Sequence, residues 1–312
     1  MILFCGRGNE KLGKKIADYL GTPLGDAKFE RFPDGEIFVK LEEDIRGRDV
    51  FIVQSTCHPV NENIMELLIF IDSARRASAK TITAVIPYYG YARQDRKDEG
   101  RTPITAKLVA NLLTSAGCER VLTMDLHANQ IQGFFDIPVD NLLAEPVISE
   151  YYASLNIDDL VLVSPDVGNV KRSRVYANRL NGELAIIDKR RISGSEVETG
   201  HMIGDVEGKT VLMVDDMIST AGTICGAAAM CREMGAKKVF VGATHGIFCG
   251  PAVQRLQEAP IDEIVVTDTI PACAKIQAEL GDKLKVLSVA PLMGEAIHRI
   301  HNNESVSALF LK

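Results

Sequence analysis

The sequence predicts an α/β protein of two tandem domains, each built on a mostly parallel β-sheet flanked by helices. Short β-branched runs alternate with helical patterns along the chain, and this order is typical of parallel strands joined by helical crossovers. Runs such as ITAVI at 82–86 and TVLMV at 210–214 are largely apolar on both faces, as expected of strands covered on both sides. A chain of 312 residues is long enough for two domains of about 150 residues.

In the first half of the chain, each element follows from this alternation. An apolar or β-branched run predicts a strand, and apolar residues spaced three or four apart predict a helix. The expected order is a strand at 2–5, a helix over 10–20, strands at 36–41 and 49–54, a helix over 63–77, and strands at 81–86 and 120–125. Pro138, Asn141 and Pro146 then interrupt the pattern, and we expect the first domain to end at 147.

The second half continues the same rhythm over 148–299, with a tail at about 300–312 that we expect to pack on the first domain. Strands are expected at 160–164, 184–188, 210–214, 238–243, 263–267 and 285–289, with helices between most of them. Segments 73–90 and 229–246 share a helix end, an Ala-Lys pair, an apolar strand and a closing glycine. This echo fits duplication of one α/β unit, and it also fits a chance likeness between helix-to-strand joints.

Composition excludes several classes of protein. With 35 Lys and Arg against 42 Asp and Glu, the net charge of -7 argues against a nucleic-acid partner bound through a basic surface. The longest apolar stretch, 64–71, contains Glu66 and is far shorter than the roughly 20 residues that span a membrane. The first residues lack the apolar core of a signal peptide, so we expect a cytoplasmic protein. Seven cysteines without a Cys-x-x-Cys pair fit reduced thiols better than disulfides or a zinc site.

Two glycine patterns near the N-terminus only partly match nucleotide-binding loops. The segment from Gly8 to Lys15 nearly matches a phosphate-binding loop, but Lys15 stands where a hydroxyl should reach magnesium. Gly6-Arg7-Gly8 lacks the third glycine of a dinucleotide fingerprint, because Lys11 occupies that position. Both patterns are therefore interpreted as a strand-to-helix turn.

The most informative segment is VLMVDDMISTAGT at 211–223. Its apolar strand ends in Asp215 and Asp216, whose carboxylates can accept hydrogen bonds from sugar hydroxyls. Small and hydroxylated residues then open a helix, where backbone N–H groups and the helix dipole favour a phosphate. These residues are Ser219, Thr220, Ala221, Gly222 and Thr223. The segment resembles the phosphoribosyl-binding loop of the phosphoribosyltransferase fold, although a solvated strand end with a Ser or Thr N-cap is the simpler alternative.

Five further motifs follow one another over nearly the whole chain. They are FPDGE at 32–36, YARQDRK at 91–97, DLHA at 125–128, SPD at 164–166 and DKRR at 188–191. Together with the closing segment 298–311, they resemble the ribose-phosphate pyrophosphokinase family. The resemblance implies two phosphoribosyltransferase-like domains and an enzyme of nucleotide biosynthesis. Such an enzyme transfers the diphosphoryl group of ATP to the anomeric hydroxyl of ribose 5-phosphate, and it releases AMP.

The resemblance also implies which residues of the first domain bind ATP. It assigns adenine recognition to the 32–36 turn and contacts with the phosphates and base to the loop after the 81–86 strand. The implied ATP-binding residues are Phe32, Asp34, Gly35, Glu36, Arg93, Gln94 and Arg96. Without the other motifs, a Pro-Asp-Gly surface turn and a solvated charge run would explain these two segments.

The remaining motifs resemble metal-binding and catalytic segments of the family. Mg²⁺ is implied at His127 beside the nucleotide and at Asp166 beside the diphosphoryl group. Because magnesium prefers oxygen, Asp166 is the better candidate for a direct ligand, and contact of His127 through water or phosphate is as plausible as direct coordination. Lys189 and Arg191 are implied as the catalytic cations, with a plain basic strand end as the alternative. The segment 192–201 shows no regular period and is interpreted as a mobile lid.

In the same way, the ribose 5-phosphate site is implied to combine Arg191 with the Asp215–Asp216 pair and residues 219–223. Two departures from the family limit what is implied. Ser219 stands where most relatives carry a carboxylate, so no base role is assigned there. The segment from Lys97 to Arg101 is shorter and more acidic than in relatives, so control by phosphate or ADP is left open, as are the nucleotide donor and the metal preference.

The family resemblance further implies a homohexamer whose ATP site is completed by a neighbouring subunit. Three other functions use parts of the same pattern. A phosphoribosyltransferase would keep the 211–223 segment but would not need the 32–36 and 91–97 motifs. A noncatalytic relative would be expected to lose Lys189, Arg191 or the metal residues, all of which are present. A DNA-binding repressor on this fold would need an added helix-turn-helix, and neither end of the sequence suggests one.

Overall fold

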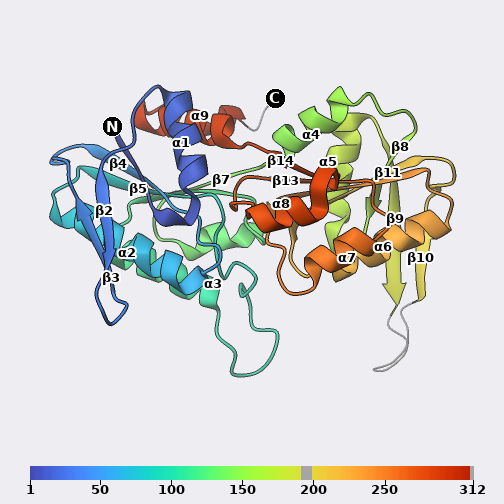
Figure 1. Ribbon diagram of the computed structural model, residues 1–312, viewed down its shortest axis with the longest axis horizontal. Coiled ribbons are helices and arrows are strands. Elements are labelled where there is room, and N and C mark those ends of the chain that lie inside the picture. The colour runs from blue at the N-terminus through green and yellow to red at the C-terminus, as the bar shows by residue number, and fades with distance from the viewer. Residues whose placement is uncertain (191–198, 310–312) are drawn as a thin grey trace. The chain divides into compact units, whose positions relative to one another are not determined.

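The computed structural model describes residues 1–190 and 199–309, which form two units (Figure 1). The first unit is Met1–Leu143 with Thr269–Pro271 and Ser288–Lys312, and the second is Ala144–Asp268 with Ala272–Leu287. Each unit has a largely parallel sheet with helices packed on it, so the α/β prediction is confirmed. The predicted domain ranges, 1–147 and 148–299, stay predictions.

The first unit contains a five-stranded parallel sheet in the order β1-β4-β5-β6-β7. Its strands are β1 (Ile2–Cys5), β4 (Asp49–Val53), β5 (Thr81–Ile86), β6 (Arg120–Met124) and β7 (Val139–Leu142). Figure 1 shows α1 (Glu10–Leu20) and α9 (Ala290–His301) on one face, and α2 (Val60–Arg76) and α3 (Thr105–Ala116) on the other. Phe4, Ile52, Leu67 and Phe70 are fully buried between these layers, so the core lies on both sides of the sheet.

A separate antiparallel hairpin, β2 (Ala27–Arg31) and β3 (Ile37–Leu41), belongs to the same unit. Phe29 on β2 packs edge-on against Phe70 of α2, with ring centroids 5.5 Å apart. The hairpin is therefore held by its apolar side chains against α2, and the turn between its strands projects away from that contact (Figure 1).

The second unit contains a seven-stranded sheet in the order β10-β9-β8-β11-β12-β13-β14. Among its described strands, β9 and β10 pair antiparallel and the other neighbours pair parallel. The strands are β8 (Leu160–Ser164), β9 (Glu183–Arg190), β10 (Thr199–Ile203), β11 (Thr210–Ile218), β12 (Lys238–Gly246), β13 (Glu263–Thr267) and β14 (Leu284–Leu287). The helices are α4 (Glu145–Ser154), α5 (Val170–Leu180), α6 (Gly222–Glu233), α7 (Ala252–Glu258) and α8 (Ala274–Leu280).

The structure confirms the runs with the strongest local signal and corrects others. The strands at 2–5, 81–86, 160–164 and 263–267 and the helix at 10–20 are found at the predicted residues. The strands β2, β7 and β10 were not predicted, because each is short or weakly apolar and exists through its pairing with a neighbour. The predicted lid is wrong at 199–201, which lie in β10 opposite β9, and 192–198 lie outside the described residues.

Two expectations from composition can be compared with the structure. In the described ranges, no helix combines the length and apolar character needed to cross a membrane. All seven cysteines are free, which agrees with the prediction of reduced thiols. The strand-to-helix turn predicted near the N-terminus is also confirmed, because β1 ends at Cys5, a short 3₁₀ turn covers Arg7–Asn9, and α1 begins at Glu10.

Candidate active site

The turn between β2 and β3 presents one aromatic ring and two carboxylates to solvent. The Gly35 N–H donates to the Phe32 carbonyl at 2.8 Å, and the Phe32 N–H donates to the Glu36 carbonyl at 2.9 Å. Gly35 has a φ of +96° with open space around it, which suits glycine at the last position of a tight turn. The side chains of Phe32, Asp34 and Glu36 are exposed. The three side chains therefore project from a hydrogen-bonded turn.

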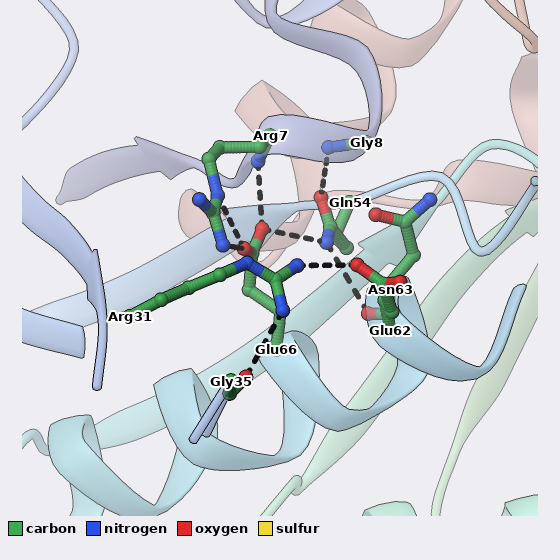
Figure 2. Close-up of polar contacts among 8 residues, drawn as sticks. All are labelled: Arg7, Gly8, Arg31, Gly35, Gln54, Glu62, Asn63 and Glu66. Carbon is green, nitrogen blue, oxygen red and sulfur yellow. Dashed lines mark hydrogen bonds and ion pairs between the residues drawn. The ribbon is translucent and has the colours of Figure 1, made fainter. Parts of the chain in front are cut away.

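Behind this turn, an arginine joins the hairpin to α2 (Figure 2). The Arg31 guanidinium donates through Nη1 to the Gly35 carbonyl at 3.1 Å. Its Nη2 forms an ion pair with Glu62 in the first turn of α2. One side chain thus contacts both the hairpin turn and the helix.

One helical turn along α2, a buried carboxylate organises the segment after β1 (Figure 2). Glu66, only 2% exposed, accepts from the Arg7 backbone N–H at 2.8 Å and from Arg7 Nε at 2.6 Å. It also accepts from Gln54 Nε2 at 3.0 Å, and Gln54 Oε1 accepts from the Gly8 N–H at 2.8 Å. Both oxygens of Glu66 therefore accept hydrogen bonds, and the Arg7 guanidinium compensates the buried charge. These bonds hold the turn between β1 and α1 in place.

The loop after β5 carries the predicted Arg93 and Gln94 beside a cavity of about 490 Å³. Both side chains are exposed and line the cavity together with Tyr91 and the first turn of α2. The Gln94 N–H donates to the Tyr91 carbonyl at 2.9 Å, and Thr105 at the start of α3 donates its hydroxyl to Gln94 Oε1 at 2.5 Å. The amide of Gln94 is therefore oriented at the edge of the cavity.

The structure places the predicted Arg96 apart from that cavity. Arg96 forms an exposed ion pair with Asp98 at 2.8 Å, and it is not among the residues lining the cavity. In this structure Arg96 is therefore not gathered with Arg93 and Gln94, and its predicted contact with ATP stays a prediction.

His127 lies just beyond the carboxyl end of β6. The preceding Asp125 is buried with a φ of +41°, and the Leu126 N–H donates to Asn141 Oδ1 of β7 at 3.1 Å. The side chain of His127 is exposed. The backbone before His127 is therefore anchored to the neighbouring strand, while the imidazole lies at the sheet edge where ligands of parallel sheets bind.

In the second unit, Asp215 and Asp216 lie within β11, whereas the sequence predicted that the strand ends at this pair. The strand continues to Ile218 because Asp215, Met217 and Ile218 pair with β12. Asp216 is 6% exposed, and its backbone N–H donates to Asp215 Oδ1 at 2.8 Å. Burial, and next the charge of Asp216, raise the pKa of Asp215 from 3.8 to about 7. The two adjacent carboxyl groups are thus largely shielded from water, and their oxygens can accept hydrogen bonds from sugar hydroxyls.

The following loop leads into α6 with an open helix start. Ala221 is the N-cap residue with a φ of +60°, and no side chain caps the helix. Gly222 and Thr223 are exposed in the first turn, and this turn holds no acidic residue. Backbone N–H groups and the positive end of the helix dipole therefore favour an anion at this position.

Two residues that the sequence analysis missed hold this loop in place. Cys249 donates its backbone N–H to the Ser219 carbonyl at 3.0 Å, and its Sγ lies 3.2 Å from Ser219 Oγ. Arg255 Nη1 donates to the Thr220 carbonyl at 3.0 Å. Both follow β12, the strand next to β11. Their place after a neighbouring strand is the signal that could have indicated them.

Asp166 lies two residues beyond the end of β8, at the same edge of this sheet, and begins a short 3₁₀ turn. Its Oδ1 accepts from the Asn169 N–H at 2.9 Å, and Asn169 Nδ2 donates to the Val214 carbonyl of β11 at 2.6 Å. In the part of the chain that the structure describes, no group of three or more acidic, His or Cys residues is suited to a metal. A single carboxylate still fits Mg²⁺, which is often bound by one or two carboxylates plus waters and substrate phosphates.

The two predicted cations fall at the limit of the described structure. Lys189 belongs to β9, where its backbone lies opposite Gly200 of β10. Arg191 lies outside the described residues. Their predicted catalytic roles therefore stay predictions.

Comparison with known proteins connects these features to one family. Residues 1–117 match the family model described as the N-terminal domain of ribose phosphate pyrophosphokinase, and residues 196–311 match a phosphoribosyl synthetase-associated domain. A ribose-phosphate pyrophosphokinase of Rhodopirellula baltica is 58% identical over 311 residues, covering 99% of this chain and 98% of that protein. One from Caldanaerobacter subterraneus is 55% identical over 309 residues, covering 99% and 97%.

A solved structure agrees with these sequence matches. The crystal structure of phosphoribosylpyrophosphate synthetase from Mycobacterium smegmatis superposes with a TM-score of 0.90. Its sequence is 44% identical, and the match covers 97% of this chain and 99% of that one. Sequence and fold therefore indicate the same family over nearly the full length.

Proposed function

This chain belongs to the ribose-phosphate pyrophosphokinase family, and on that basis we propose that its first unit binds ATP and its second unit binds ribose 5-phosphate. The protein is an enzyme that forms 5-phosphoribosyl 1-diphosphate from these two substrates, for nucleotide biosynthesis. The anomeric oxygen of ribose 5-phosphate attacks the β-phosphorus of ATP and loses its proton. The bond from that phosphorus to the α-phosphate oxygen breaks, and AMP leaves.

The observation that carries the proposal for the second unit is the sequence of features along β11 and α6. The Asp215–Asp216 pair is largely buried, and its carboxyl oxygens can accept hydrogen bonds from the sugar hydroxyls. Immediately afterwards, the exposed and uncapped start of α6 suits the 5-phosphate. The proposed ribose 5-phosphate residues are Asp215, Asp216, Ser219, Thr220, Ala221, Gly222 and Thr223, together with Arg191.

For ATP, we propose the cavity beside Arg93 and Gln94 together with the hairpin turn. An exposed aromatic ring and two carboxylates can stack on adenine and accept from its amino group. Arg93 supplies positive charge at the cavity wall, which suits phosphates. The proposed ATP-binding residues are Phe32, Asp34, Gly35, Glu36, Arg93, Gln94 and Arg96.

The chemistry of the transfer depends mainly on placement and on charge neutralisation. Lys189 and Arg191 are proposed to contact the transferring diphosphoryl group and stabilise the charge that develops on it. Asp166 and His127 are proposed to hold Mg²⁺, with Asp166 the more suitable direct ligand because it offers oxygen. When bound, magnesium neutralises phosphate charge and orients the phosphate chain.

The experiment for this function is an assay of the purified protein with ATP, ribose 5-phosphate and Mg²⁺, with AMP and ADP separated by chromatography. AMP that forms only with ribose 5-phosphate supports diphosphoryl transfer, whereas ADP would contradict it. Repeating the assay with added phosphate tests whether the 97–101 segment supports activation. A homohexamer in the cytoplasm is also proposed, and sedimentation of the active protein would test its size.

A further inference from the structure

We propose that the first turn of α2 is a positioning element for ATP binding, which holds both segments proposed to contact the nucleotide. Asn61 binds the loop that carries Arg93 and Gln94, and its neighbour Glu62 binds the hairpin turn through Arg31. This inference rests on the proposed ATP-binding role of those two segments. Asn61 and Glu62 line the cavity proposed for ATP and Arg31 does not, and the role proposed for all three is to hold the two segments rather than to bind the nucleotide.

The first link is between Asn61 and Tyr91. The Tyr91 hydroxyl donates to Asn61 Oδ1 at 2.5 Å, and both residues line the cavity beside Arg93. Tyr91 has a φ of +63°, a left-handed conformation that side chains other than glycine adopt rarely. A backbone in such a conformation needs support from its surroundings, and the hydroxyl bond to α2 supplies it two residues before Arg93.

The second link is between Glu62 and the hairpin turn (Figure 2). Arg31 lies at the end of β2, directly before Phe32, and its guanidinium bridges the Glu62 carboxylate and the Gly35 carbonyl. Gly35 stands between the two carboxylates proposed to recognise adenine. The bridge therefore fixes the turn at the residue between Asp34 and Glu36, through a carbonyl rather than through either carboxylate.

The helix turn that makes both links is itself anchored in the core. Asn63, which is 7% exposed, donates through Nδ2 to the Cys57 carbonyl at 2.8 Å. Its own carbonyl accepts from Gln54 Nε2 at 3.2 Å, and Glu66 is buried one turn later. The inner face of the helix is thus held rigidly while Asn61 and Glu62 face outward. Because α2 is fixed in the core, its contacts through Asn61 and Glu62 can hold the two exposed segments in fixed positions.

Because these links are exposed, a positioning role can be distinguished from a purely structural role by measuring stability. Asn61 and Glu62 are exposed, and the side chains of Arg31 and Glu62 are 42% and 51% exposed. Exposed ion pairs contribute little to folding stability. Breaking the links should therefore leave the melting temperature unchanged and act on ATP alone.

The test compares Tyr91→Phe and Arg31→Gln with two matched controls. Tyr151→Phe removes a hydroxyl that donates to Glu263 in the second unit, and Lys40→Gln removes an exposed ion pair to Glu42 on the same hairpin. We expect Tyr91→Phe and Arg31→Gln each to raise KM for ATP by about two- to tenfold, the scale of one net hydrogen bond. The KM for ribose 5-phosphate and the melting temperature should stay within error, and both controls should match the wild type.

A third variant, Glu36→Gln, distinguishes this inference from the proposed function. If Glu36→Gln raises KM for ATP while Tyr91→Phe and Arg31→Gln do not, the positioning role is overturned and the proposed ATP site stands. If none of the three variants changes KM for ATP, both are overturned. A fall in melting temperature, or an equal rise in KM for both substrates, would indicate a structural role and would also overturn the inference.

Discussion

Replacing Asp215 by asparagine should make the folded protein more stable while lowering its affinity for ribose 5-phosphate. Asp215 is largely buried beside Asp216, and these two causes raise its pKa to about 7. Asparagine keeps the carbonyl oxygen that accepts the Asp216 N–H at 2.8 Å and removes the charge. The substitution therefore removes the repulsion between the two carboxylates, and it also removes the charge that we propose binds the sugar.

The magnitude follows from the two pKa values. In the unfolded chain the group has its ordinary value of 3.8, and in the fold about 7. At about 1.36 kcal/mol for each tenfold change in proton affinity, ionising this carboxyl in the fold costs on the order of 4 kcal/mol, a cost that the acid pair shares. Because the folded pKa is raised, this group's contribution to stability is full below pH 4 and is lost as the pH rises through 7.

The assay is thermal unfolding of wild type and Asp215→Asn at pH 5 and pH 8. At pH 8 we expect the variant to be more stable by about 1–3 kcal/mol, which corresponds to a few degrees in melting temperature for domains of this size. At pH 5 the folded wild-type carboxyl is protonated but the unfolded one is already ionised, so the difference should be clearly smaller than at pH 8, and the two proteins should agree only below about pH 4. The same variant should bind ribose 5-phosphate about 10- to 100-fold more weakly, because a charge-assisted hydrogen bond is lost.

A variant that is less stable than the wild type at pH 8 would refute this reasoning, since it would mean that the acid pair stabilises the fold. A stability difference of the same size at both pH values would also refute it, because the effect would then not arise from ionisation. Binding measured by calorimetry at pH 8 separates the loss of the sugar contact from any change in folding.

Three further predictions concern other parts of the molecule. Lys189→Ala should keep its melting temperature and bind both substrates, but it should form AMP at least about 10³-fold more slowly; near-wild-type turnover in a coupled AMP-release assay would exclude the catalytic role. Glu66→Gln should lower the free energy of unfolding by about 2–3 kcal/mol in urea, because it removes a buried carboxylate that accepts from Arg7 and Gln54. Glu62→Gln, on an exposed pair of the same helix, should cost less than about 1 kcal/mol, and equal losses would contradict this distinction. Gly8→Ala should destabilise by about 1–3 kcal/mol, since its Cβ would lie 2.4 Å from a backbone oxygen; Gly100→Ala, which has open space, is the control, and a stable Gly8→Ala protein would show that the turn can move.

Much of the candidate site was predictable because its signals are local. Asp215, Asp216 and the small residues that open α6 are consecutive in sequence, so a strand end and a helix start bring them together without long-range contacts. His127 in the first unit and Asp166 in the second each follow an apolar strand, and ligands of parallel sheets bind at the carboxyl ends of the strands. These positions depend on the order of residues along short segments.

Other parts of the site depend on contacts between distant segments. The anchoring of Ser219 by Cys249 joins residues 30 apart, and the Arg31–Glu62 bridge joins residues 31 apart. Strand β10 exists because it pairs with β9, and β11 extends past its apolar run because it pairs with β12. No local propensity reports such pairings.

The sequence by itself therefore determined the α/β class, the strongest strands, the family and most candidate residues. It could do so because the hydrophobic period and the order of the motifs depend only on the residues along the chain. The tertiary structure alone decided which groups hold those residues in place and how they ionise. The raised pKa of Asp215 comes first from burial in a strand that pairs with β12 and then from the charge of Asp216. The link from α2 to both proposed ATP-binding segments comes from contacts of the hairpin and the loop with one helix. Burial and side-chain geometry are properties of the folded chain, and for this reason only the structure shows them.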